Sequence, residues 1–107
     1  MWPSRRRTPK AKLILHWNGR VWTQVTSPNP GSQGNDLLGV RAVSGTDAWA
    51  VGSTKNGTKE SSLILRWNGH TWNRISSPSP GSTSLLYSVA ATSRTDAWAA
   101  GIFSNGV

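Results

Sequence analysis

The chain has 107 residues, a formal net charge of +8, seven tryptophans and no cysteine. This length leaves room for one small domain, and the lack of cysteine excludes disulfides, thiol chemistry and most structural zinc sites. No segment approaches the ~20 apolar residues of a membrane span, and the apolar run after the basic start is too short for a signal peptide, which needs ~7–15. The cellular location stays open.

The basic charge is concentrated at the start of the chain. Residues 1–12 carry five of the twelve positive charges, and the remainder has seven basic and four acidic residues, a net charge of +3. We expect residues 1–12 to be a disordered, solvated leader. Such a leader can attract nucleic acid or an anionic membrane surface, but we expect nucleic-acid binding least among the functions considered.

An internal repeat dominates the rest of the sequence. Residues 13–31 read LILHWNGRVWTQVTSPNPG and residues 63–81 read LILRWNGHTWNRISSPSPG, with 11 of 19 positions identical at an offset of 50. The run TDAWA at residues 46–50 returns at residues 95–99, at an offset of 49. One residue has therefore been lost in a loop, where a repeated structural unit tolerates deletion.

Each copy contains an Asn-Gly dipeptide between alternating apolar segments, the strongest short-range signal for a β-hairpin. A two-residue loop there places Trp17 opposite Arg20 and Leu15 opposite Trp22. The predicted strand pairs are residues 12–17 with 20–26, and residues 62–67 with 70–76.

A second kind of strand pair is rich in Ala, Val and Gly: residues 38–43 with 48–53, and residues 86–92 with 97–103. Trp49 and Val51 share one face of such a strand and small residues the other, so we expect cover on both faces. Proline-rich connections follow each Asn-Gly hairpin, and no helical period occurs anywhere. The sequence predicts an all-β chain.

The order DAWAVG at residues 47–52, LIL at residues 63–65, Gly69 and Trp72 resembles the tandem propeller repeats of large bacterial extracellular proteins. It is similar also to photosystem II assembly-factor-like and sialidase-type propellers. The sialidase Asp-box is not intact, and the signatures of kelch and WD40 blades are absent, so the subfamily stays open. The resemblance implies β-propeller blades and is the only hint of an extracellular location.

In that frame, residues 38–76 form one whole four-stranded blade, flanked by two half-blades. The predicted fold is an incomplete propeller over residues 13–103, followed by a tail at residues 104–107. Rings close with ~4–8 blades, so the missing strands must come from outside these repeats. Two alternatives stay open: identical copies assemble head to tail into a ring, or the sequence is a piece of a longer propeller.

No catalytic constellation is visible. The four acidic residues are Asp36, Asp47, Glu60 and Asp96, of which Asp47 and Asp96 are expected to bind backbone N–H groups in equivalent turns. His16 and His70 each align with an arginine in the other copy, which indicates an exposed position rather than a metal ligand. We therefore predict no enzyme activity, and no catalytic, cofactor-binding or metal-binding residue.

Six of the seven tryptophans recur at repeat positions 17/67, 22/72 and 49/98, which favours a packing role over ligand binding. The predicted function is a non-catalytic binding or scaffold module for carbohydrate or protein, completed by self-association. Its ligand-binding residues are not identified, but the polar loops at residues 27–36, 53–61 and 77–84 should share one face. The alternative is a fragment of a larger extracellular propeller enzyme or adhesin with no separate activity.

Overall fold

The computed structural model describes residues 11–105, so residues 1–10 of the expected leader and the last two residues of the expected tail lie outside it. The described residues form strands and turns without a helix, which confirms the all-β prediction. The strands are β1 (Leu15–Trp17), β2 (Trp22–Gln24), β3 (Gly34–Ser44), β4 (Asp47–Asn56), β5 (Lys59–Trp67), β6 (Trp72–Ile75), β7 (Thr83–Ser93) and β8 (Asp96–Ser104).

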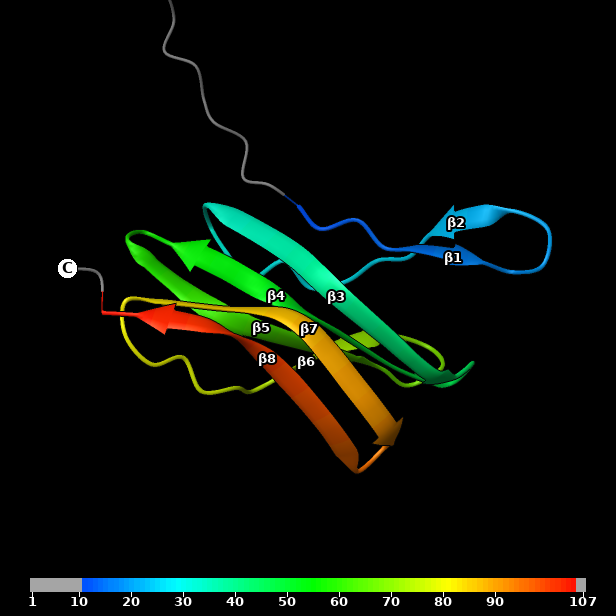
Figure 1. Ribbon diagram of the computed structural model, residues 1–107. Helices are drawn as coiled ribbons and strands as arrows, with labels where there is room; N and C mark the ends of the chain where they lie inside the picture. Colours follow the sequence, from blue (N-terminus) through cyan, green and yellow to red (C-terminus); the bar gives the residue numbers. More distant parts are fainter. Residues whose placement is uncertain (1–10, 106–107) are drawn as a thin grey trace, which may run out of the picture.

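The centre of the molecule is an antiparallel meander in which β3 pairs with β4, β4 with β5, and β5 with β6. The β7–β8 pair joins this sheet through one parallel bridge between Glu60 and Thr83. It otherwise lies beside the meander, while the β1–β2 hairpin is a separate sheet that projects at one end (Figure 1). The strands of residues 11–105 form no closed barrel or ring.

Equivalent strands in the two copies pair in the same register. In β3–β4, Gly34 pairs with Lys55, and in β7–β8 the residues 49 positions later, Thr83 and Ser104, form the matching pair. Both pairs of strands also have two register shifts at equivalent places. The hairpins β1–β2 and β5–β6 match in the same way at an offset of 50.

The predicted register of the Asn-Gly hairpins is wrong. Trp17 pairs with Trp22 rather than with Arg20, because the loop has four residues, 18–21, instead of two. The Asn18 side-chain oxygen accepts hydrogen bonds from the backbone N–H groups of Arg20 and Val21 at 2.9 and 3.0 Å. Within the loop of residues 18–21 only Gly19 has a positive φ, whereas a type I′ turn needs two residues with a positive φ.

This register brings two tryptophans together in each hairpin. The ring centroids of Trp17 and Trp22 lie 5.6 Å apart, and those of Trp67 and Trp72 lie 5.7 Å apart, in tilted arrangements. Tilted aromatic pairs at this distance contribute about 0.5–1.5 kcal/mol beyond their buried area. The tryptophan pair therefore stabilises the four-residue loop that the Asn side chain organises.

The loop predicted at residues 53–61 is largely strand. Pairing between β4 and β5 continues to Asn56 and Lys59, and only a tight turn through Gly57, with φ of 61°, separates the strands. The polar composition of this stretch, with two serines and two threonines, predicted a loop. In the structure Ser53 and Thr54 are buried within the extended ladder.

Strand β4 is buried on both faces, as predicted. One face carries the small residues Ala48 and Ala50, which pair with Trp67 and Leu65 on β5. Ile14 and Val25, next to β1 and β2, pack against this buried cluster. Its other face carries Trp49 and Val51, which line a narrow groove together with residues of β7 and β8. The meander is thus a layer between the β1–β2 hairpin and the β7–β8 pair.

Gly52 permits the close approach of β3 to β4. A Cβ at this position would collide with the carbonyl oxygen of Asp36 on the paired strand. Gly101 has the same relation to the Leu85 carbonyl oxygen in the second copy. A side chain at either position would push the two strands apart next to a register shift.

We therefore expect Gly52→Ala to lower the free energy of unfolding by about 1–3 kcal/mol, the usual cost of overpacking. The measurement is urea unfolding followed by tryptophan fluorescence. Gly45→Ala is the matched control, because a Cβ at that turn position meets no atom within 4 Å. Equal effects of the two substitutions would contradict the close packing of β3 on β4.

Candidate functional site

Strand β8 is exposed along its whole length, although its repeat equivalent β4 is the most buried strand of the molecule. Strand β4 lies between β3 and β5, whereas β8 pairs with β7 alone and leaves one edge open. Trp98 in β8 is 77% exposed, which is unusual for so large an apolar side chain. An open edge that carries apolar side chains favours pairing with a further strand.

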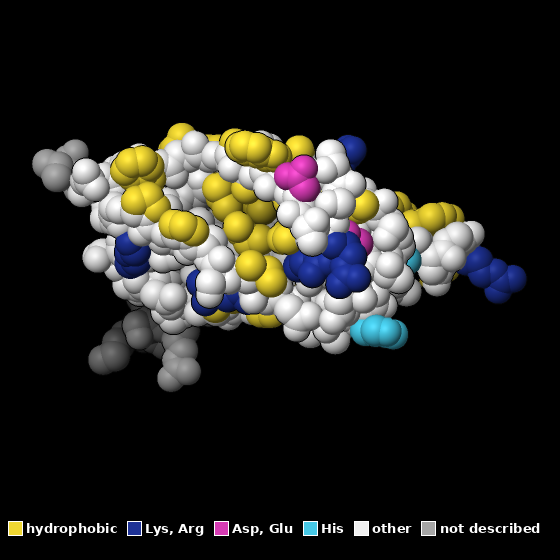
Figure 2. Space-filling model, turned by 90° about the horizontal axis from the view of Figure 1, so that it is seen from below, with side chains coloured by type: hydrophobic (Ala, Val, Ile, Leu, Met, Phe, Trp, Pro, Cys, Tyr) yellow, Lys and Arg dark blue, Asp and Glu magenta, His cyan; other side chains and the backbone are white. Residues whose placement is uncertain are grey.

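The outer face of the β1–β2 hairpin shows the same contrast. Leu15 is 49% exposed and Trp22 is 65% exposed, whereas their equivalents Leu65 and Trp72 are 0% and 8% exposed. Seen from the side on which β8 lies, apolar side chains gather across the middle of the molecule and continue onto the projecting end (Figure 2). Half of the recurring tryptophans thus pack internally, and three, Trp17, Trp22 and Trp98, are exposed.

Two apolar hollows lie between the layers. A cleft of about 420 Å³ opens between the hairpin and the meander, and Ile14, Val25, Val40, Ala48 and Trp72 are among its lining residues. A groove of about 270 Å³ runs between the meander and β8; its lining includes Trp49, Val51, Ile64, Val89, Ala97 and Trp98.

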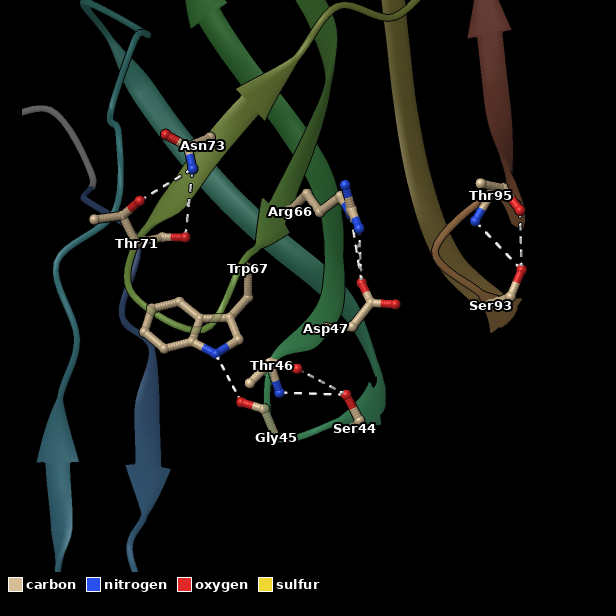
Figure 3. A network of polar contacts seen from close by, with 10 residues as sticks. All are labelled: Ser44, Gly45, Thr46, Asp47, Arg66, Trp67, Thr71, Asn73, Ser93 and Thr95. Carbon is tan, nitrogen blue, oxygen red and sulfur yellow. Dashed lines mark hydrogen bonds and ion pairs between the residues drawn. The ribbon is translucent and has the colours of Figure 1, made fainter.

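The turn that begins β4 carries the ion pair of the described structure. Arg66 on β5 reaches Asp47 with an N···O distance of 3.3 Å (Figure 3). The Arg66 guanidinium also lies 5.3 Å from the centre of the Trp49 ring. The expectation that Asp47 binds local backbone is wrong, because Ser44 accepts the N–H of Thr46 instead. Asp47 is nearly fully buried, and its second carboxylate oxygen has no hydrogen-bond partner among residues 11–105.

The second copy has the carboxylate and the ring of this cluster but not the cation. Asp96 and Trp98 are the equivalents of Asp47 and Trp49, and Asp96 is exposed, accepting a hydrogen bond from Thr92. Within residues 11–105 Asp96 makes no ion pair. The residue that aligns with Arg66 is His16, which lies on β1 at the far side of the molecule.

The other residues that sequence analysis considered for chemistry are dispersed. Glu60 accepts a hydrogen bond from Ser53 at 2.8 Å, and Asp36 is exposed on β3. His16 and His70 are both exposed, as expected from their alignment with arginines. Residues 11–105 contain no group of three or more potential metal ligands.

The segments predicted as loops at residues 27–36, 53–61 and 77–84 meet at one end of the sheets. Parts of them belong to strands, and we call residues 27–34, 55–59 and 77–83 the loop end. Lys59 donates hydrogen bonds to the carbonyl oxygens of Ser79, at 3.0 Å, and of Gly81. Ser62 donates to the Pro78 carbonyl at 2.7 Å, and its own N–H binds the Ser79 hydroxyl at 3.0 Å. Sequence reasoning missed these anchors, because nothing in the repeat distinguishes an inward-facing serine from a solvent-exposed one.

The first loop of this end is held by side-chain oxygens. Asn56 accepts the backbone N–H of Ser32 at 2.6 Å, and Asn35 accepts that of Gly31 at 2.7 Å. Lys12 is buried, and its ammonium group donates to Asn29 at 2.8 Å. The contacts of Asn56 and Lys12 join segments far apart in the chain, so the loop end is a defined surface.

Removing the cation of the buried pair should destabilise the fold. We expect Arg66→Ala to lower the free energy of unfolding by about 2–3 kcal/mol, because Asp47 would remain buried without its counter-charge. Arg20→Ala removes an exposed arginine from the β1–β2 turn and should change it by less than about 0.5 kcal/mol. Urea unfolding at neutral pH tests both; similar losses would show that Arg66 acts only as an ordinary surface charge.

Burial, followed by the charge of Arg74, lowers the pKa of Lys12 from 10.5 to about 8. The unfolded chain then binds more protons between pH 8 and pH 10.5, so the free energy of unfolding should rise with pH across that window. Lys12→Met should flatten this rise, whereas Lys55→Met at an exposed position should not. The test is urea unfolding at several pH values; an unchanged slope in Lys12→Met would contradict the assignment.

Comparison with known proteins adds no functional information, so a function must be inferred from the surfaces described above. No family model, no curated protein and no solved structure matches this chain. Among the described residues, no helix is long and apolar enough to cross a membrane.

Proposed function

We propose that this chain is a non-catalytic β-propeller module that binds or scaffolds other molecules. Strands β3 to β6 would be one whole blade, and the pairs β1–β2 and β7–β8 would be two half-blades. The fold itself would then be a building unit, completed by strands from outside residues 11–105. The ligand would be a carbohydrate or a protein, as the resemblance to extracellular propeller repeats suggests.

One observation carries this proposal: equivalent strands that begin with the same four residues, DAWA, are buried in one copy and exposed in the other. Strand β4 has neighbours on both edges and both faces, whereas β8 has an open edge and an exposed tryptophan. Blades of a propeller cover each other in this manner, so an exposed copy marks the place of a missing neighbour. A sheet finished within its own chain would not retain so much exposed apolar surface.

The loop end is the surface on which we place ligand binding. Its backbone is held by hydrogen bonds between segments far apart in the sequence. It also presents exposed polar side chains, among them Ser32, Gln33, Lys55 and Thr58. Rigid presentation of polar groups lowers the entropic cost of binding a glycan or a peptide segment. The opposite end, with the turns at residues 44–47, 68–71 and 93–96, has shorter connections.

The proposal leaves the source of the missing strands open between other chains and further repeats of one longer chain. In the second case the described part would be a fragment of a larger propeller enzyme or adhesin, with no separate activity. The exposed strands favour a missing neighbour in both cases. In-frame repeats beyond either end of the sequence would support the fragment.

Glycan-array and protein pull-down experiments with the purified protein test the binding role. The triple variant Gln33→Ala, Lys55→Ala, Thr58→Ala should lose at least about tenfold in affinity for any ligand found, because it removes exposed groups of the loop end. The matched control Arg20→Ala, His70→Ala alters the opposite end and should bind as the wild type does. Equal loss in both variants would place binding elsewhere, and the absence of any ligand would overturn the proposed function.

A further inference from the structure

We infer that the missing neighbour is a second copy of this chain, whose β8 strand adds to β1 and whose Trp98 enters the cleft between the hairpin and the meander. This inference rests on the proposed function, because it identifies what completes the half-blades. The contact is head to tail: β8 and the β7–β8 pair come from one copy, and the hairpin and its cleft from the next.

The cleft and the groove occupy equivalent places in the repeat, but the groove has a wall on one side that the cleft lacks. Groove residues Ile64, Val89 and Ala97 correspond, by the repeat offsets, to cleft residues Ile14, Val40 and Ala48. The groove has a further wall, Trp49 of β4. In the cleft, the place of Trp49 would be taken by a residue on a strand that pairs with β1 as β4 pairs with β5. The repeat equivalent of Trp49 is Trp98 of β8.

This correspondence explains the exposures at both sides of the contact. Val40 on the cleft wall is 70% exposed, and Trp98 is 77% exposed, so each presents a large apolar side chain without cover. Placing Trp98 of one copy against Val40 and Ala48 of the next reproduces the packing of Trp49 near Val89 and Ala97. Both apolar surfaces are removed from water in the same step.

The register of the added strand follows from β4 and β5. There Ala48 pairs with Trp67, Trp49 with Arg66 and Ala50 with Leu65. Applying the offsets, Ala97 would face Trp17 of the partner subunit, Trp98 would face its His16, and Ala99 would face its Leu15. The open edge of β8 would thereby gain an antiparallel partner, the usual mode of strand addition.

The charges agree with this register. In the meander Arg66 lies against Asp47 and over Trp49. In the assembled pair, His16 of the partner subunit would occupy the place of Arg66, beside Asp96 and Trp98. A cationic or neutral imidazole can donate a hydrogen bond to the Asp96 carboxylate, so the exposed acid gains a donor on assembly.

A contact between two different surfaces leaves one free surface of each kind on every pair, so further copies can add until a ring closes. Each copy contributes one whole blade and two halves. Two, three or four copies would close rings of about four, six or eight blades, within the range that propellers use.

Light scattering on the wild-type protein, over a series of concentrations, is the first measurement. We expect a discrete oligomer whose mass is a small multiple of the chain mass of 11.5 kDa. A folded wild-type monomer at all concentrations would overturn the inference. The binding role would still be judged separately by the glycan and pull-down experiments, whose failure with an intact ring would overturn the proposed function alone.

Two variants test the head-to-tail contact itself. Trp98→Glu blocks the β8 side of the contact and Val40→Glu blocks its cleft side, so each variant should be a monomer. Both residues are exposed in the single chain, so each variant should still fold. Mixed together, they retain one intact pair of surfaces and should form a dimer that does not grow. Val43→Glu, the same substitution on β3 outside the cleft, is the control and should assemble as the wild type does.

Two other results would contradict the head-to-tail contact. A Trp98→Glu or Val40→Glu variant that still forms the wild-type oligomer, or a mixture that stays monomeric, would contradict it. Circular dichroism shows whether each variant keeps its strands; if Val40→Glu unfolds, Ala42→Glu on the same wall replaces it. His16→Arg gives an independent readout, since it restores the Arg66 arrangement and should tighten association about two- to fivefold.

Discussion

The structure depends on the requirement that a central β-strand have partners on both edges and cover on both faces. Strand β4 meets it: β3 and β5 pair along its edges, and the hairpin residues and the β7–β8 pair cover its two faces. Unpaired backbone groups or exposed apolar faces at this position would each cost free energy. The small side chains Ala48, Ala50 and Gly52 let the neighbouring layers approach closely enough to provide that cover.

Burial is therefore concentrated in one copy of the repeat. The fully buried apolar side chains Val51, Leu63 and Leu65 all belong to the meander, and the equivalent positions of the other copy are more exposed. A domain of this size buries a limited share of its surface, so it has little stability to spare. The exposed apolar positions of the other copy therefore contribute little to the stability of the single chain.

The sequence predicted much of this arrangement. The offsets of 50 and 49 identified the strand pairs, the loop deletion and the equivalent positions of the two copies, and the Ala-Trp-Ala alternation predicted a strand covered on both faces. It did not predict the hairpin register, because an Asn side chain that binds two N–H groups converts a two-residue loop into a four-residue one. Polar composition likewise concealed the ladder through Ser53 and Thr54.

The surfaces were harder to predict than the strands. Trp49 and Trp98 stand in the same local sequence, so no pattern within a repeat indicates that one is covered and the other exposed. That difference arises from the neighbours each strand has in space. The pairing of Asp47 with Arg66 was missed for a related reason, since the two residues are 19 positions apart and meet only when β4 and β5 are aligned.

The pairs β1–β2 and β7–β8 have the same geometry as the equivalent strands of the meander. Strands β7 and β8 show the same pairings, the same two register shifts and the same glycine contact as β3 and β4. The β1–β2 hairpin has the same register and a similar tryptophan pair to β5–β6. Halves that are formed in advance would need little ordering if they meet as we propose, so more of the free energy of burying apolar surface would remain as affinity. On this proposal the repeat specifies the surfaces of a contact as well as the strands of a fold.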